Sequence, residues 1–146
     1  MPKQPKTPAG QSVLIVEDSK DFSDLLKFVL EDDGFAGIQF PVEGADVVEW
    51  AKEHKPVAIL MDLALRHKDG RSFIDLLKAD PVTKKIPIIV ITGRDLSHKE
   101  ILELQVMEVK YMRKGRVEMD DIRAEVKNAA RKASTKPAGS PGQSAS

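Results

Sequence analysis

The chain has 146 residues, 23 Lys and Arg against 23 Asp and Glu, and no cysteine. This length predicts one domain with a hydrophobic core, because domains commonly contain about 100–200 residues. The lack of cysteine excludes a disulfide framework, a thiolate nucleophile and a zinc site with cysteine ligands. No apolar stretch approaches the roughly 18 residues of a membrane span, and no apolar signal segment is present, so we expect a cytoplasmic protein that does not span a membrane. The zero net charge argues against non-specific nucleic-acid binding as the main role.

The two ends of the chain differ in composition from the middle. Residues 1–11 contain three prolines, and residues 134–146 consist mostly of small residues and proline. Neither segment can form a core, so we expect a disordered N-terminal tail over 1–11, one domain over 12–133, and a disordered tail or linker stub over 134–146. The 12–133 segment contains 20 basic and 23 acidic residues, so its net charge is −3.

The first half of the domain alternates between short apolar runs and helical apolar stripes. Strands are predicted at 13–16, 36–40 and 57–61, each formed by an apolar run. Between the first two, a helix with an apolar stripe at Phe22, Leu25, Leu26 and Val29 is expected to end at Gly34. A second helix is predicted over 44–54, ending before Pro56.

The second half of the domain continues the same alternation. A third helix is predicted between Gly70 and Pro81, followed by a strand over 86–91. A fourth helix is expected over 97–105, a short strand over 109–112, and a last helix over 117–133. Five strands, each followed by a helix with right-handed crossovers, predict an α/β fold, a three-layer doubly wound sandwich around a parallel sheet.

Ligands in such sheets bind beyond the carboxyl ends of the strands, so the residues that follow each strand identify the candidate site. These residues are Glu17 and Asp18 after the first strand, Asp62 after the third, Thr92 and Gly93 after the fourth, and Lys114 and Gly115 just past the fifth. Carboxylates held close together repel one another, so the cluster needs a counter-cation, either Lys114 or a hard divalent metal. Oxygen ligands alone favour Mg²⁺.

Each of these residues also has a purely structural interpretation. Asp18 or Ser19 could cap the first helix, Thr92 could be a turn residue, and Lys114 could be a solvated surface lysine. Their joint placement at one edge of the sheet favours a functional site over these separate interpretations.

Four motifs in this layout resemble the receiver domain of two-component response regulators. Glu17 and Asp18 end V-L-I-V-E-D, and Asp62 lies in I-L-M-D-L-A-L-R-H-K-D-G. Thr92 lies in I-P-I-I-V-I-T-G, and Lys114 ends K-Y-M-R-K. The resemblance covers about 12–133 and implies the flavodoxin-like fold of that family, with five helices and the strand order 2-1-3-4-5.

The resemblance also implies a role for each matching residue. Asp62 is the expected phosphoacceptor, attacking a phosphoryl group on a kinase histidine. Asp18, Asp62 and the backbone carbonyl of Ala64 are the expected Mg²⁺ ligands, with Glu17 acting through water. Further phosphoryl contacts are expected from Lys114 and Thr92.

The same resemblance implies a switch in which Thr92 moves toward the phosphoryl group. The motion is coupled to Tyr111 and alters the face formed by the fourth helix, the fifth strand and the fifth helix. The alternative for Tyr111 is a strand aromatic that only packs on the sheet.

Three positions depart from the usual family pattern. Arg66 replaces a common proline, which could loosen the loop after Asp62, and Gly93 replaces a common alanine. Gly115 replaces a proline whose peptide bond is often cis, so we expect a trans bond after Lys114. Two other positions, Ala64 and Arg94, are expected to tune the phosphoryl lifetime, with Arg94 either shielding the group or pointing to solvent.

The expected function is a signalling switch rather than an enzyme acting on an external substrate. The expected partners are a histidine kinase or histidine phosphotransfer protein and a downstream effector protein, with no direct nucleic-acid or membrane binding. The expected oligomeric state is a monomer, or a phosphorylation-dependent dimer through the fourth-helix to fifth-helix face.

Two other functions are alternatives to the switch. A phosphorylation-independent adaptor, or pseudo-receiver, is favoured by Arg66 and the Lys114–Gly115 pair but opposed by the complete acidic set. A phosphatase or phosphotransferase for external substrates is disfavoured, because no second carboxylate stands two residues after Asp62. The chain could also be the receiver part of a longer regulator.

Overall fold

The computed structural model describes residues 11–66 and 68–135, with side chains to residue 133. The tails predicted over 1–11 and 134–146 lie outside these residues, apart from Gln11 and the last two helical residues. The strands are β1 (Ser12–Val16), β2 (Ala36–Gln39), β3 (Ala58–Met61), β4 (Ile88–Thr92) and β5 (Lys110–Arg113). The helices are α1 (Lys20–Asp32), α2 (Val47–His54), α3 (Gly70–Ala79), α4 (His98–Val106) and α5 (Met119–Thr135).

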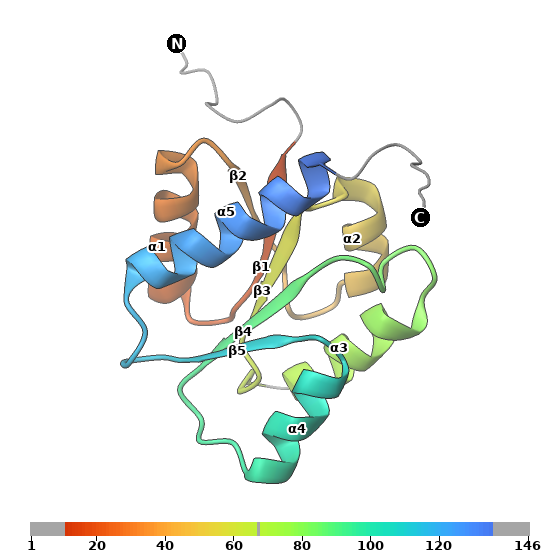
Figure 1. Cartoon of the computed structure of the whole chain (residues 1–146). Helices are drawn as coiled ribbons and strands as arrows, with labels where there is room; N and C mark the ends of the chain where they lie inside the picture. The colour runs from red at the N-terminus through yellow and green to blue at the C-terminus, as the bar shows by residue number, and fades with distance from the viewer. Residues whose placement is uncertain (1–10, 67, 136–146) are drawn as a thin grey trace.

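The strands form one parallel sheet in the order β2-β1-β3-β4-β5. Helices α1 and α5 cover one face of this sheet, and α2, α3 and α4 cover the other (Figure 1). All residues of β1, β3 and β4 are buried, as expected of strands with helices on both faces. The predicted three-layer α/β fold and its strand order are confirmed.

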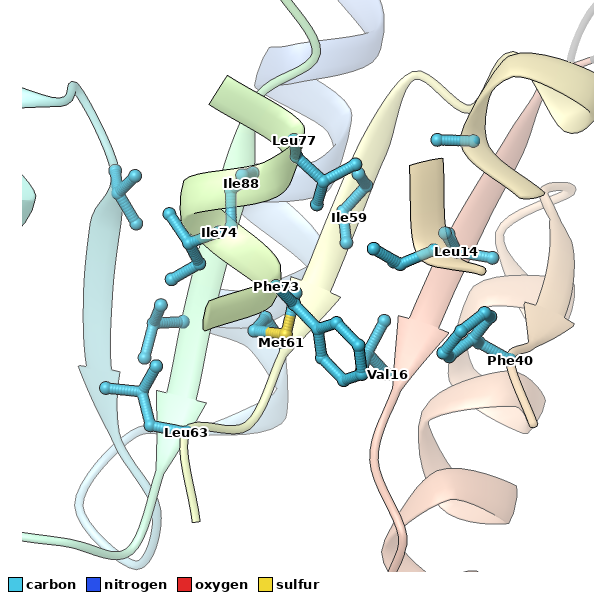
Figure 2. Packing of buried hydrophobic residues seen from close by; sticks show 14 of the residues in the cluster. Leu14, Val16, Phe40, Ile59, Met61, Leu63, Phe73, Ile74, Leu77 and Ile88 are labelled. Carbon is cyan, nitrogen blue, oxygen red and sulfur yellow. The ribbon is translucent and has the colours of Figure 1, made fainter. Parts of the chain in front are cut away.

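Each face of the sheet has its own hydrophobic core. Alternate residues of the central strands, such as Leu14, Ile59 and Ile88, pack against Ile74 and Leu77 of α3 (Figure 2). The residues between them in the strands point to the opposite face, where α1 and α5 cover them. These two cores fix the positions of the strand ends, and with them the positions of the candidate site residues.

Local sequence signals explain where the helices begin. The side chains of Ser19, Asp46 and Asp69 accept hydrogen bonds from backbone N–H groups in the first turns of α1, α2 and α3. Ser97 and Glu100 form a capping box at the start of α4. Ser19, rather than Asp18, therefore caps α1, which leaves the Asp18 carboxylate available for other contacts.

Some sequence predictions about the elements were wrong in detail, such as the start of α2, which lies at Val47 rather than at residue 44. Leu25 is 43% exposed, and Leu30 instead completes the buried stripe of α1. Strand β4 begins at Ile88 rather than at residue 86, and it ends with Thr92 as its last residue. Proline has no N–H to donate to a sheet ladder, so Pro87 precedes the strand and contributes only its carbonyl, which accepts from the Ile59 N–H at 2.9 Å.

Candidate functional site

Three of the predicted site residues meet at the carboxyl edge of the sheet. The Lys114 Nζ atom lies 3.0 Å from Glu17 Oε1 and 3.1 Å from Asp62 Oδ2. The side chains of Glu17 and Asp62 are almost fully buried, and that of Lys114 is 24% exposed. One ammonium group therefore bridges two buried carboxylates, which supplies the counter-cation that the sequence required.

Hydrogen bonds fix the position of Asp62. Its backbone N–H donates to the Val16 carbonyl at 3.0 Å, which continues the pairing of β3 with β1. Its Oδ1 atom accepts from the Ala64 N–H at 3.0 Å, while Oδ2 accepts from the Lys114 ammonium. Both oxygens of the predicted phosphoacceptor are thus oriented by donors.

The loop after Asp62 is anchored on both sides. Leu63 is buried, and its carbonyl accepts from the Gly70 N–H at 2.9 Å. Ala64 and Asp69 form an isolated antiparallel bridge across the same loop. The first turn of α3 therefore rests directly on the segment that carries the acceptor.

Gly70 is a positioning residue that the sequence reasoning missed. A Cβ atom at this position would lie 2.3 Å from the Asp62 carbonyl oxygen and 2.7 Å from Leu63 Cα. Both are backbone atoms, which cannot move aside as a flexible side chain can. The adjacent pair Asp69–Gly70 at the start of a helix is the available signal, but the apolar pattern uses Gly70 only to mark where the third helix begins.

Asp18 lies outside the bridge formed by Lys114. Its Oδ2 atom accepts a hydrogen bond from the backbone N–H of Arg66. The Glu17 carboxylate, in contrast, contacts Lys114 through Oε1 and accepts from the Ser19 N–H at 3.0 Å through Oε2. Within residues 11–66 and 68–135, no three acidic or histidine side chains are grouped closely enough to hold a metal ion.

Burial and the contacts within this cluster shift two pKa values. Burial raises the pKa of Glu17 above its ordinary value, against the hydrogen bonds from Ser19 and Lys114, and the nearby Asp62 charge raises it further. For Lys114, burial lowers the pKa, but the hydrogen bonds and charges of Glu17 and Asp62 outweigh it and raise the pKa overall. The ammonium also lies 4.5 Å from the centre of the Phe22 ring, a second favourable contact for the cation.

The peptide bond after Lys114 is trans, as predicted, since no cis bond occurs in the described residues. Gly115 has a φ of +84°, a conformation that glycine adopts without strain. The Lys114 N–H donates to the Thr92 carbonyl at 2.8 Å, so β4 positions this lysine through its backbone. A glycine in place of proline is therefore compatible with a lysine directed at Asp62.

Thr92 and Tyr111 lie on adjacent strands. Thr92 is fully buried, and its Oγ1 atom accepts from the Arg94 N–H at 3.3 Å. Tyr111 pairs with Val90 in the sheet and packs, partly buried, against the core beneath α2, α3 and α4. The structure thus contains the packing contact that was the alternative interpretation of Tyr111.

The loop between β4 and α4 is held by two arginines. The Arg94 side chain forms an ion pair with Glu100 on α4, with 3.3 Å between Nη1 and Oε2. Arg113 donates to the Gly93 carbonyl at 3.3 Å and to the Asp95 carboxylate. The sequence did not predict the Arg113 contacts, because the partners lie 18 and 20 residues away in a different loop.

Comparison with known proteins agrees with this geometry. The family model described as "Response regulator receiver domain" matches residues 13–127. The chain belongs to the response regulator receiver family. The phosphate regulon transcriptional regulatory protein PhoB of Escherichia coli is 32% identical over 108 residues, which cover 72% of this chain and 45% of PhoB. The PhoB protein of Klebsiella pneumoniae matches to the same extent, so the chain spans about half the length of these curated relatives.

Solved structures of other receivers are similar in fold. The receiver domain of sensor histidine kinase PA1611 from Pseudomonas aeruginosa, which has a magnesium ion in its active site cleft, is 26% identical, with a TM-score of 0.69. The match covers 82% of this chain and 97% of that domain. The chemotaxis protein CheY4 of Vibrio cholerae, at 18% identity, has a TM-score of 0.70, with 82% and 98% of the two chains covered.

Receivers are signalling modules rather than enzymes that turn over a substrate, and they bind Mg²⁺ in the active site. The residues of this receiver fit such an ion chemically. The donors are carboxylate and carbonyl oxygens, and Mg²⁺ needs only one or two carboxylates besides water. A cleft of about 300 Å³ opens beside Glu17 and Asp18, with Arg66 in its lining. No described helix of this receiver combines the length and apolar character needed to cross a membrane.

Proposed function

We propose that this receiver accepts a phosphoryl group on Asp62 from a histidine kinase or histidine phosphotransfer protein and signals through a partner-binding face. The observation that carries the proposal is the buried Asp62 carboxylate, whose Oδ2 atom lies 3.1 Å from Lys114 Nζ at the carboxyl end of β3. A buried carboxylate beside a bridging cation suits an acceptor whose negative charge increases on phosphorylation. We also propose that the domain comprises residues 12–133 and that the protein acts in the cytoplasm.

The proposed transfer is a displacement at phosphorus by the Asp62 carboxylate. An oxygen of Asp62 attacks phosphorus, the new P–O bond forms, and the P–N bond to the donor imidazole breaks with its electron pair leaving on nitrogen. Lys114 stabilises a phosphoryl oxygen, and the Ala64 N–H orients the carboxylate. Asp18, Asp62 and the Ala64 carbonyl would hold Mg²⁺ directly, and Glu17 would hold it through water. The ion would supply neutralisation of the charge that develops in the transfer.

Replacing Asp62 by asparagine is expected to abolish phosphorylation, because the amide keeps the shape of the side chain but is not a nucleophile. Intact mass is measured after incubation with Mg²⁺ and acetyl phosphate or a cognate kinase. Wild type should gain one phosphoryl group and Asp62→Asn none. Asp75→Asn, which alters an exposed carboxylate on α3, is the matched control and should behave as wild type.

The same measurement separates the switch from the adaptor. A wild-type protein that gains no phosphoryl group from either donor would refute the phospho-accepting function and favour the pseudo-receiver. An adduct that persists in Asp62→Asn would mean that another residue is the acceptor.

We further propose that Thr92 and Tyr111 transmit the phosphorylated state. The Thr92 hydroxyl is buried and accepts a long hydrogen bond of 3.3 Å from the Arg94 N–H, so it can be drawn toward a phosphoryl oxygen. The change would reach the face formed by α4, β5 and α5, where Lys110 of β5 pairs with Glu125 of α5.

Replacing Thr92 by valine is expected to separate transfer from switching, because valine keeps the shape and loses the hydroxyl. The variant should still gain a phosphoryl group on Asp62, while the phosphorylation-dependent NMR shift of the Tyr111 ring should largely disappear. A Tyr111 shift equal to that of wild type would exclude the Thr92 hydroxyl from the switch.

The expected output partner is a protein. The PhoB relatives are named as transcriptional regulatory proteins, and the matched region covers less than half of each. Residues 12–133 have a net charge of −3, which opposes direct binding of this domain to DNA. We propose an effector protein, or a second phosphorylated receiver, at the face formed by α4, β5 and α5.

A further inference from the structure

Arg66 lies four residues after Asp62, in the loop between β3 and α3. Its backbone N–H donates to Asp18 Oδ2 at 2.5 Å, which joins two segments 48 residues apart in the sequence. Proline has no N–H, so a proline at this position could not form this hydrogen bond. The contact therefore depends on residue 66 being something other than proline, and it ties the loop to the end of β1.

The two residues before Arg66 are held by packing and by a backbone bridge. The preceding residue, Leu65, is buried in the core, and Ala64 is bridged to Asp69. Gly70 closes the loop with its hydrogen bond to the Leu63 carbonyl. A hydrogen-bond donor held in this way can determine the orientation of the carboxylate that accepts from it.

Among the described residues, the Arg66 N–H is the donor to the Asp18 carboxylate. Its carboxylate is half-buried and forms no ion pair with any other described residue, whereas Glu17 and Asp62 both contact Lys114. The Arg66 N–H donates to Oδ2, so Oδ1 takes no part in this hydrogen bond. A carboxylate can accept several hydrogen bonds, so an outer donor and a metal ion can share it.

We propose that the backbone amide of Arg66 is the positioning donor for the Asp18 carboxylate, holding Oδ2 while Oδ1 serves as a ligand of Mg²⁺. The inference rests on the proposed function, in which Asp18 binds that ion. Some groups hydrogen-bond to a metal ligand without contacting the metal themselves. Removing such a group typically weakens metal binding about 10–100-fold. The Arg66 side chain, which lines the neighbouring cleft, is not required for this role.

Two substitutions separate the amide from the side chain. Arg66→Pro removes the N–H, and Arg66→Ala keeps it while removing the guanidinium. Calorimetric titration with Mg²⁺, without any phosphodonor, is expected to give about tenfold weaker binding for Arg66→Pro and nearly wild-type binding for Arg66→Ala. Equal affinity of the two variants would overturn the proposal.

Hydrogen exchange of the Arg66 amide tests the contact without changing the loop. In Mg²⁺-free wild type this amide should exchange slowly, and in Asp18→Ala it should exchange at least about tenfold faster, as expected when a stable hydrogen bond is removed. Addition of Mg²⁺ should leave the wild-type amide protected. Faster exchange on adding Mg²⁺ would show that the ion competes with the amide, and would overturn the proposal even if Arg66→Pro fails to fold.

The outcomes also distinguish this inference from the proposed function. Wild type that binds no Mg²⁺ would contradict the metal part of the proposed function and this inference together. Wild type that binds Mg²⁺, with no difference between Arg66→Pro and Arg66→Ala, would contradict this inference alone.

Discussion

Replacing Lys114 by alanine is expected to slow phosphorylation of Asp62 by about 10²–10³-fold, the usual effect of removing one donor that stabilises developing charge. The variant should also be less stable in the absence of divalent ions. The loss should fall below the about 3–5 kcal/mol typical of a fully buried pair, because the Lys114 side chain is 24% exposed. Acetyl phosphate kinetics and urea unfolding in EDTA measure the two effects.

The stability effect of Lys114→Ala should depend on pH. The pKa of Glu17 is already raised by burial, so the folded protein binds this proton more tightly than the unfolded chain does. Ionisation of Glu17 therefore reduces stability as pH rises, and the loss of Lys114 raises this pKa further. The difference in unfolding free energy between wild type and Lys114→Ala should therefore increase from about pH 4, near the ordinary carboxyl pKa, to neutrality.

Lys110→Ala is the matched control for this prediction. Lys110 begins β5, which ends one residue before Lys114, but its side chain is 56% exposed and pairs with Glu125 away from the site. Its loss should leave phosphorylation near the wild-type rate. A difference between Lys114→Ala and wild type that does not vary with pH would contradict the assignment of Lys114 as the counter-cation of Glu17.

Replacing Gly70 by alanine is expected to destabilise the protein and to displace Asp62. The added Cβ would lie 2.3 Å from the Asp62 carbonyl oxygen, so either α3 or the acceptor segment must shift. Overpacking typically costs about 1–3 kcal/mol, and we expect the upper end because the obstructing atoms belong to the backbone. Urea unfolding measures the loss, and acetyl phosphate kinetics should show slower transfer.

Gly93→Ala is the matched control, because it also adds one Cβ atom beside the site. A Cβ there would contact Lys114 at 3.9 Å, an ordinary van der Waals distance. Its stability should be equal to or slightly above that of wild type, because alanine restricts the unfolded chain more than glycine does. Equal stability of Gly70→Ala and Gly93→Ala would refute the positioning role of Gly70.

The sequence predicted the fold and the edge of the sheet where the site lies, because both follow from hydrophobic periodicity and parallel topology. The buried strands are continuous apolar runs, and each ends next to a polar residue. The carboxyl ends of parallel strands share one edge, so Glu17, Asp62 and Lys114 could be placed together without coordinates.

The details that the sequence did not predict depend on contacts between distant segments. Helical periodicity allows the apolar stripe to lie slightly to either side around the helix. The sequence of α1 alone therefore could not show whether Leu25 or Leu30 is the buried residue. The substitution of Arg66 for proline was expected to loosen the loop, whereas its amide hydrogen-bonds to Asp18. Nothing near Arg66 in the sequence indicates that its acceptor stands 48 residues earlier. The close approach of Gly70 to the Asp62 backbone likewise depends on how α3 packs on the loop.

The most direct measurement is the location of the phosphoryl group in the phosphorylated wild-type protein. Reduction of an aspartyl phosphate with borohydride converts that aspartate to homoserine, which tandem mass spectrometry then assigns to one residue. Homoserine at position 62 alone is the predicted result. Homoserine at another position, or a phosphoryl group that borohydride does not convert, would contradict Asp62 as the acceptor.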